Sequence, residues 1–295
     1  MQADLARLSS GTPAMLAPPA VAPLQGRHAL IVEKPGPSTA ISFGFPIDVK
    51  RGSREYYALW LANSWLGEHR NSSSHLYQVI REARGINYGN YSYIEAFPNG
   101  GRRQQPPTGV GRRAQLFEVW IRSVPEERAV FSLRAGLREV EKLIQNGMTK
   151  EDFEFTRAFL QKYCLHFAED TEARLGYAVD DRFYGLDEPH LARFRRMMGE
   201  LTLAEVNAAI KKHLKPENIA FALVTANAEQ LKAALVSGAP SPIDYGGAPK
   251  SDSILAEDKE IERHPLGIPV ANIQIVPVSS VFEGAAIVGG PAGAQ

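Results

Sequence analysis

An arginine and a tyrosine seven residues apart, Arg81 and Tyr88, are the side chains of this sequence best suited to chemistry. A phenol has only two side-chain torsions to freeze, so it can present a hydrogen-bond donor that is fixed in advance. Arginine adds several donors in a rigid fork. Between the two lies Gly85, which can stop a helix by adopting a left-handed conformation that other residues resist. A helix, a glycine stop and a strand in this order could bring both donors to one edge of a sheet.

The same spacing also fits a purely structural interpretation. Arg81 could form a surface ion pair with a neighbouring acid, while Tyr88 packs within the sheet. Spacing alone favours that interpretation, so the case for a site depends on the surrounding sequence.

The seven histidines show no metal-binding spacing. His69 and His75 flank a turn, but six residues separate them, and neither H-x-x-x-H nor H-x-x-E-H occurs anywhere in the chain. His166 with Glu169 is an isolated helical pair, and His213 suits the last turn of a helix, where positive charge favours the dipole. We therefore predict that this chain holds no metal and no cofactor of its own.

Other reactive groups give little support for a different chemistry. Cys164 is the only cysteine, which excludes an intrachain disulfide and a four-cysteine zinc site, and its apolar helical setting is typical of a small buried hydrophobe. The acids Glu169, Asp170, Asp180 and Asp181 are most simply helix ends and solvated faces. The absence of a G-x-S-x-G motif, a phosphate loop and a dinucleotide fingerprint disfavours serine hydrolases and nucleotide-binding proteins.

Composition indicates a globular protein with a substantial core. The 295 residues are 44% hydrophobic, and 33 basic side chains balance 33 acidic ones, so no overall field favours nucleic acid or an anionic membrane. The densest basic cluster stands in a Gly- and Pro-rich loop that we interpret as a solvated connection, without a nucleic-acid role. That cluster comprises Arg102, Arg103, Arg112 and Arg113.

Targeting signals are weak in this sequence. No stretch approaches the roughly 20 uninterrupted apolar residues of a membrane-spanning helix, so we predict a soluble protein without a membrane span. Prolines interrupt the apolar stretch 15–24, and it lacks a charged start and a cleavage site, which disfavours a signal peptide. Cytoplasm and periplasm both remain open.

Hydrophobic periodicity predicts alternating groups of strands and helices. This order favours an α+β fold in which a mainly antiparallel sheet is covered by helices on one face. A Ser123 and Glu126 capping box is expected to start the most strongly amphipathic helix. The predicted strands are 30–32, 41–45, 88–94, 116–121 and 219–223, and the predicted helices are 53–66, 72–84, 123–144, 149–167, 191–198 and 202–214.

Composition shifts suggest three segments. Residues 1–27 are rich in Ala, Pro, Ser and Gly, which is typical of an exposed linker. Residues 28–240 carry the regular pattern and form the predicted domain, while 241–295 read as an extended C-terminal tail whose end is expected to be disordered.

Several motifs, in this order, resemble the C-terminal half of the pitrilysin or insulinase-like zinc peptidases, the M16 family, in the bacterial branch related to mitochondrial processing peptidase. The likeness extends over about residues 28–240, and the helix, glycine and strand junction is its most specific part. The matching stretches are TAISFGFPI (39–47), YYALWLANSWLGEHR (56–70), SSHLYQVIREARGINYGNYSY (73–93), GMTKEDFE (147–154), RLGYAVDDRFYG (174–185) and LTLAEVNAAIKKHLKPENIAFALVT (201–225).

This resemblance implies a fold of the LuxS/MPP-like metallohydrolase type, in which two similar halves close on an extended peptide. The first half of such a peptidase carries zinc on an inverted H-x-x-E-H motif with a distant glutamate, and the second contributes an arginine and a tyrosine. By resemblance, Tyr88 would donate to the scissile carbonyl oxygen as it becomes anionic, and Arg81 would hold a substrate backbone carbonyl. Gly85 would shape the junction between them.

The resemblance leaves three hypotheses. In the first, the chain is the zinc-free half of a heterodimeric peptidase, inactive alone, and its partner is a zinc-bearing N-terminal half on a separate chain or in the front of a longer gene. In the second, it is a structural or assembly subunit that kept the fold without hydrolysis. In the third, it is a truncated coding sequence. An upstream H-x-x-E-H domain would favour the first, and neither the peptide substrate nor the oligomeric state follows from the sequence.

Overall fold

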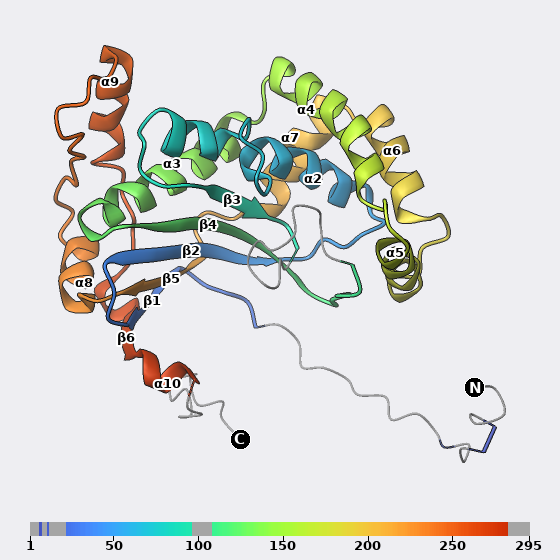
Figure 1. The fold of residues 1–295 in the computed structure, drawn as a ribbon, viewed down its shortest axis with the longest axis horizontal. Helices are drawn as coiled ribbons and strands as arrows, with labels where there is room; N and C mark the ends of the chain where they lie inside the picture. Colours follow the sequence, from blue (N-terminus) through green and yellow to red (C-terminus); the bar gives the residue numbers. More distant parts are fainter. Residues whose placement is uncertain (1–5, 8–10, 12–21, 96–107, 283–295) are drawn as a thin grey trace.

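The computed structural model describes residues 6, 7, 11, 22–95 and 108–282. Within these residues the chain forms one six-stranded sheet in the order β3-β4-β2-β5-β1-β6 (Figure 1). Three of the five strand pairings are antiparallel, while β1 pairs in parallel with both β5 and β6. The strands are β1 (Arg27–Glu33), β2 (Ser38–Ile47), β3 (Asn90–Tyr93), β4 (Gln115–Pro125), β5 (Ile219–Thr225) and β6 (Ile273–Pro277).

Helices cover one face of this sheet (Figure 1). The mainly antiparallel α+β architecture predicted from the sequence is therefore confirmed. The helices are α2 (Arg54–Gly67), α3 (Ala129–Asn146), α4 (Lys150–Tyr163), α5 (Thr171–Tyr184), α6 (His190–Glu200), α7 (Leu203–His213), α8 (Ala228–Val236), α9 (Asp252–Ile261) and α10 (Val278–Phe282). Short 3-10 turns lie at η2 (Glu126–Arg128), η3 (Cys164–His166) and η4 (Val270–Asn272).

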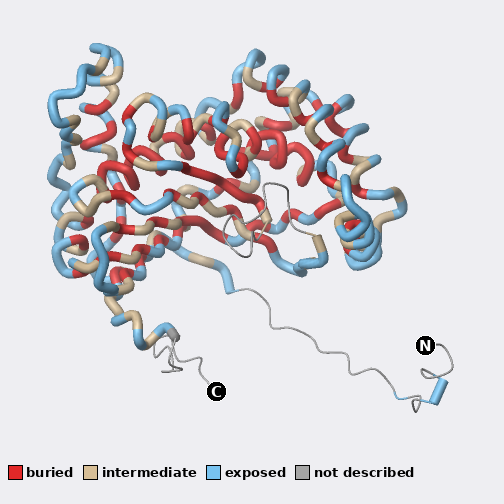
Figure 2. The backbone as a smooth tube through the Cα atoms, viewed as in Figure 1, coloured by how far each residue is buried: buried red, intermediate tan, exposed pale blue. Residues whose placement is uncertain are grey.

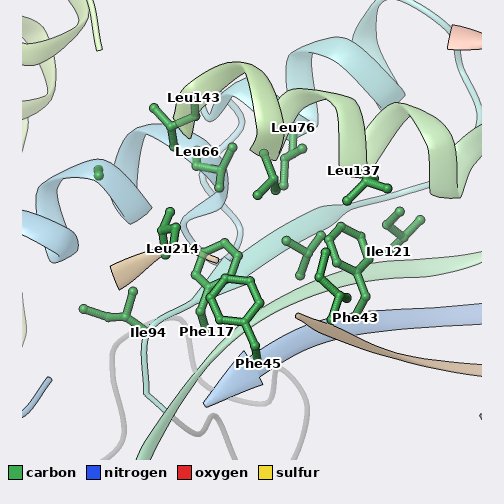
Figure 3. Packing of buried hydrophobic residues seen from close by; sticks show 14 of the residues in the cluster. Phe43, Phe45, Leu66, Leu76, Ile94, Phe117, Ile121, Leu137, Leu143 and Leu214 are labelled. Carbon is green, nitrogen blue, oxygen red and sulfur yellow. The ribbon is translucent and has the colours of Figure 1, made fainter. Parts of the chain in front are cut away.

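The core lies between the sheet and the helices packed on it. Alternation along β2 and β4 turns Phe43, Phe117 and Ile121 toward the helical layer, where they meet Leu66 of α2 and Leu137 of α3 (Figure 3). Burial in Figure 2 follows this interface, with the outer surfaces of α5 and α9 largely exposed. As the sequence pattern predicts, most of the circumference of α2 is buried.

Helix starts follow local capping chemistry in most cases. The Ser53, Thr149 and Thr202 side chains each accept a hydrogen bond from a first-turn backbone N–H, and Thr202 forms the predicted capping box with Glu205. The capping box predicted at Ser123 is wrong. Strand β4 continues through Ser123 to Pro125, so η2 intervenes and α3 starts at Ala129 without a side-chain cap.

The chain beyond residue 240 contributes regular structure that the sequence pattern did not predict. Helix α9 packs beside α3, and β6 extends the sheet by pairing with β1. Helices α5 and α8 are likewise absent from the predicted order. Arg102, Arg103, most of the predicted linker 1–27 and the predicted disordered end all lie outside the described residues.

No helix within the described ranges is both long and apolar enough to cross a membrane.

Gly44 in β2 gives a direct test of how closely β2 and β4 approach. A Cβ atom placed there would lie 2.0 Å from the backbone oxygen of Phe117, whereas one placed at Gly36 would meet nothing within 4 Å. We expect Gly44→Ala to lower the free energy of unfolding by about 2 kcal/mol or more, because backbone cannot yield as a flexible side chain does. Gly36→Ala should change it by less than about 0.5 kcal/mol. Equal denaturation midpoints for the two variants in urea would contradict this packing.

Candidate functional site

The segment between α2 and β3 contains a π-helix, η1 (Tyr77–Glu82), which follows directly on two α-helical residues, His75 and Leu76. The N–H of Ala83 donates to the carbonyl of Gln78, five residues back, at 2.9 Å. Gly85 follows with φ 65°, the left-handed conformation expected of it. The predicted helix and glycine stop are therefore present, but in a π form, which is uncommon and occurs frequently at functional sites.

The structure brings the Arg81 and Tyr88 residues together at the surface. The Arg81 Nη1 lies 3.4 Å from the carbonyl oxygen of Tyr88. Its guanidinium carbon lies 4.6 Å from the centre of the Tyr77 ring and 5.6 Å from that of Tyr88. Cation–π attraction to two rings thus limits the directions that the guanidinium can take. Tyr88 is 78% exposed.

Tyr88 lies in a loop, and its predicted place in a strand is wrong because β3 begins only at Asn90. The Asn87 and Asn90 side-chain amides donate to each other at 2.9 Å, and Asn87 also donates to the carbonyl of Arg122 on β4. The N–H of Arg122 donates to Gly89. These bonds form a turn ahead of β3, and the turn leaves Tyr88 outside the sheet.

A neighbouring acid also reaches Arg81, as the structural interpretation expects. The Arg81 Nε lies 3.8 Å from a carboxylate oxygen of Glu82, which is itself half exposed. An ion pair this long between exposed groups contributes little stability. Within the described residues, no hydrogen bond engages the Tyr88 hydroxyl, so that hydroxyl is open to an incoming group.

Arg84 holds the turn between η1 and β3, and the sequence analysis overlooked it. Its side chain is 1% exposed, and its Nε and Nη2 lie 2.7 and 2.8 Å from Asp258 and Glu257 of α9. Its Nη1 donates to the carbonyl of Val79, inside η1. The sequence gives no clear signal for this burial, because Arg84 stands close to the charged Arg81 and Glu82 and its partners are far away in the chain.

Two more groups from the C-terminal segment reach the same turn. The Tyr245 hydroxyl donates to the second carboxylate oxygen of Asp258 at 2.7 Å. The ammonium of Lys250 donates to the carbonyl of Ala83 at 2.7 Å. The backbone just after Arg81 is therefore held from outside by residues 245–258.

His75, at the start of this segment, anchors it to α3. Its Nε2 lies 2.7 Å from a carboxylate oxygen of Glu139, and its ring stacks on Trp65 at 4.4 Å. Burial alone would raise the pKa of Glu139, but the His75 hydrogen bond and charge, aided by Lys142 and Arg138, lower it to about 2. His75 thus makes a structural contact between this segment and α3.

His69 lies in an aromatic cluster over the start of β3. Its Nδ1 is 2.7 Å from the Tyr93 hydroxyl, and its ring centre is 4.4 Å from that of Tyr91. Beside it, burial raises the pKa of the Glu68 carboxyl to about 7, although Ser64 donates a hydrogen bond to it. The turn between α2 and η1 therefore contains a carboxyl group that titrates near neutrality.

The remaining candidates have structural partners. His213 contacts Glu55 at 2.7 Å, His166 pairs with Glu169, and burial raises the pKa of the Cys164 thiol. Asp170 caps α5 as expected of a helix end. No group of three or more His, Cys, Asp or Glu side chains that could hold a metal occurs among the residues described.

The predicted solvated position of Asp180 is wrong. Its side chain is 2% exposed and pairs with the equally buried Arg51 at 2.8 Å. Arg51 also pairs with Glu95 at 3.0 Å, so three charges share this buried cluster. The exposed residues directly before Asp180 in α5, and those at 182 and 183, conceal this burial in the sequence pattern.

The fold is an α+β domain with a six-stranded, mostly antiparallel sheet. A sequence profile of the family described as "Peptidase M16 inactive domain" matches residues 3–160. The chain belongs to this family, and as an inactive M16 domain it lacks the zinc site. The resemblance to the C-terminal, zinc-free half is thereby confirmed.

Solved structures support the fold. The chain is similar to the peptidase M16 inactive domain from Pseudomonas fluorescens, with TM-score 0.56 and 22% identity over 70% of this chain and 46% of that one. A protease from Helicobacter pylori gives 0.57 and 14%, covering 73% and 48%. A chain of complex III2 from Candida albicans gives 0.56 and 11%, covering 87% and 53%.

The chain thus spans about half the length of these structural relatives. Comparison with the curated proteins finds no match.

The raised pKa of Glu68 predicts that the protein loses stability as the pH rises. Its pKa is raised from 4.5 to about 7, so the folded state holds a proton that the unfolded state releases. The free energy of unfolding should therefore fall between pH 4.5 and 7, by up to about 3 kcal/mol. Glu68→Gln should flatten this part of the stability curve measured by urea denaturation, and Glu82→Gln, at an exposed carboxyl, should not. A slope unchanged by Glu68→Gln would refute the assignment.

The lowered pKa of Glu139 predicts that the free energy of unfolding decreases as the pH falls below 4.5. Because its pKa is lowered from 4.5 to about 2, its stabilisation is complete above pH 4.5 and disappears as the pH falls toward 2. Glu139→Gln should lose up to about 3 kcal/mol at neutral pH and show a shallower acid limb. Thermal unfolding at pH 2.5, 4 and 6 measures both effects, and parallel curves for the two proteins would contradict them.

Proposed function

We propose that this chain is the zinc-free half of an M16-type peptidase and supplies substrate contacts to peptide hydrolysis by a zinc-bearing partner half. The observation that carries the proposal is the meeting of Arg81 and Tyr88 at the surface, with a 3.4 Å contact between them, in a member of the M16 inactive domain family. Both are donors, and neither is committed to the protein core.

Tyr88 is suited to stabilise a developing oxyanion. Its ring is positioned beside the Arg81 guanidinium, while the 78% exposure of the residue leaves the hydroxyl accessible to another molecule. In the proposed complex this hydroxyl donates to the carbonyl oxygen of the scissile bond as negative charge accumulates there. One such fixed donor contributes about 100-fold or more to kcat in acyl-transfer enzymes.

Arg81 is suited to hold a substrate carbonyl. The Tyr77 and Tyr88 rings restrain its guanidinium, but its side chain is still 34% exposed, so some of its five N–H groups can face a ligand. A backbone carbonyl of an extended peptide accepts from such a fork irrespective of side-chain sequence. This role determines the position of the peptide and leaves its sequence preference to other surfaces.

The residues of this chain do not fit a zinc ion. The sequence has no H-x-x-E-H motif, and the described side chains include no cluster with three suitable ligands. Zinc supplies Lewis-acid and water-activating chemistry when it is bound, and we assign that chemistry to the partner half. This chain then binds, orients and stabilises charge, and we expect no hydrolysis from it alone.

The donor pair lies just before the edge strand β3, and the face of the sheet opposite the helices is the proposed side of the partner half. An open groove of about 500 Å³ lies on this face, with mainly apolar lining from β2, β4 and β5 and from residues 22–24. Small side chains at Ser42, Gly44, Ala220 and Ala222 leave the backbone of the sheet accessible. A second half of similar size, as the twofold greater length of the structural relatives implies, is proposed to close over this face.

A second candidate function is that of a structural subunit. The fold similarity to a chain of complex III2 from Candida albicans, which covers 87% of this chain, favours considering it. In that case the chain forms a stable complex whose partner also lacks zinc ligands, and Tyr88 and Arg81 have no role in hydrolysis. The adjacent reading frame discriminates, since an upstream H-x-x-E-H domain favours the peptidase.

The peptidase proposal predicts separate effects for the two donors. In a reconstituted complex with a zinc-bearing half, Tyr88→Phe should lower kcat about 100-fold, because it removes one donor to the oxyanion. Arg81→Ala should mainly raise KM, about tenfold or more, because it removes a charged hydrogen bond to bound peptide.

Matched controls come from α4. Arg157 lies over the Phe153 ring at 5.1 Å, much as Arg81 lies over Tyr77, but it is outside the proposed site. Arg157→Ala should therefore leave cleavage of a fluorogenic peptide unchanged. Tyr163→Phe removes a hydroxyl from a half-buried ring on the same helix and should be equally silent. If Tyr88→Phe and Arg81→Ala retain full activity in a correctly assembled complex, the assigned roles are wrong.

A further inference from the structure

The turn that carries the donor pair is held by a second part of the chain. Arg84 stands three residues after Arg81 and four before Tyr88, and its buried guanidinium pairs with Asp258 and Glu257 of α9. We call Arg84, Asp258, Tyr245 and Lys250 the α9 clamp. We propose that the α9 clamp positions the Arg81 and Tyr88 donors for the reaction, with Arg84 and Asp258 as positioning residues; this inference rests on the proposed function.

The clamp acts on the backbone on both sides of Arg81. Arg84 donates to the carbonyl of Val79 within η1, and Lys250 donates to the carbonyl of Ala83, one residue past η1. Two carbonyls on either side of Arg81 are thereby fixed by cations. Fixing these points restricts the direction in which Arg81 leaves η1 and the path of the chain from Gly85 to Tyr88.

The charged groups of the α9 clamp pair with one another and, through Glu257, with α3. Asp258 accepts from both Arg84 and the Tyr245 hydroxyl, which occupies its two oxygens with separate donors. Glu257 pairs with Arg84 at 2.8 Å and with Arg138 of α3 at 2.9 Å. The clamp is therefore continuous with α3, one of the helices packed on the sheet, and it rests on a rigid element.

A buried ion pair elsewhere in the molecule provides a matched control. Arg51 and Asp180 lie 2.8 Å apart, with side chains 3% and 2% exposed, as buried as Arg84 and Asp258. Their pair joins the loop before α2 to α5, and α5 and α9 lie at opposite ends of the molecule (Figure 1). Asp258→Asn and Asp180→Asn should each lower the stability of the chain by a similar amount. Only Asp258→Asn should disturb the positions of Arg81 and Tyr88.

Hydrogen exchange in the isolated chain tests the clamp directly. The amides of Ala83, Gly85 and Ile86 donate to carbonyls within η1 and report on the turn. Asp258→Asn should speed their exchange about tenfold or more relative to α2 and α7 amides, whereas Asp180→Asn should not. Should Asp258→Asn fail to fold, Tyr245→Phe removes only one hydrogen bond to Asp258 and should give a smaller effect of the same kind. Equal acceleration throughout the chain in both variants would overturn the proposal.

Kinetics in the reconstituted complex test the consequence. Asp258→Asn should lower kcat about 10-fold to 100-fold and also raise KM, because a misplaced Tyr88 loses transition-state contact and a misplaced Arg81 binds the peptide less well. When it is combined with Tyr88→Phe in a double variant, Asp258→Asn should lower kcat only slightly below that of Tyr88→Phe alone. Unchanged kcat alongside faster exchange of the turn would overturn the positioning role. Full activity of Tyr88→Phe would instead defeat the proposed function, while the exchange result still decides whether the clamp holds the turn.

Discussion

The burial of one positive charge, the guanidinium of Arg84, constrains much of this structure. A guanidinium removed from water is costly unless carboxylates pair with it, and the turn that carries Arg84 offers no such partner of its own. Asp258 and Glu257 meet this need from 174 and 173 residues further along the chain. Helix α9 therefore packs beside α3, and the loop before α9 brings Tyr245 to Asp258 and Lys250 to the turn after η1.

The same C-terminal segment also completes the sheet. After α9 the chain reaches β6, which pairs with β1 at one edge, while β3, directly after the clamped turn, forms the other edge. One segment thus fixes structure at both edges. An edge strand is the least supported part of a sheet, so a donor pair placed just before β3 needs support from outside the ladder. The ion pairs of Arg84 and the anchoring of His75 by Glu139 supply that support.

Features encoded by near neighbours were predictable from the sequence, and features encoded by distant ones were not. The amphipathic period of α3, the caps at Thr149 and Thr202 and the left-handed Gly85 are local, and all were correctly predicted. The π form of η1, the exit of Tyr88 from the sheet and the burial of Asp180 depend on cross-strand amides and distant arginines. Helix α9 was not predicted because many of its side chains are charged, and its apolar face is therefore short.

The two arginines near the turn differ in their surroundings, and this difference limits the chemistry available at the surface. Arg84 is neutralised inside the molecule, whereas the Arg81 guanidinium and the Tyr88 phenol remain at the surface. Among described residues, the one carboxylate that reaches Arg81 is Glu82, at 3.8 Å and half exposed, which is a poor setting for a general base. The surface therefore presents donors without a group that would activate water. In the proposed function, this surface stabilises negative charge that forms on a bound carbonyl, and the zinc-bearing half supplies the nucleophile.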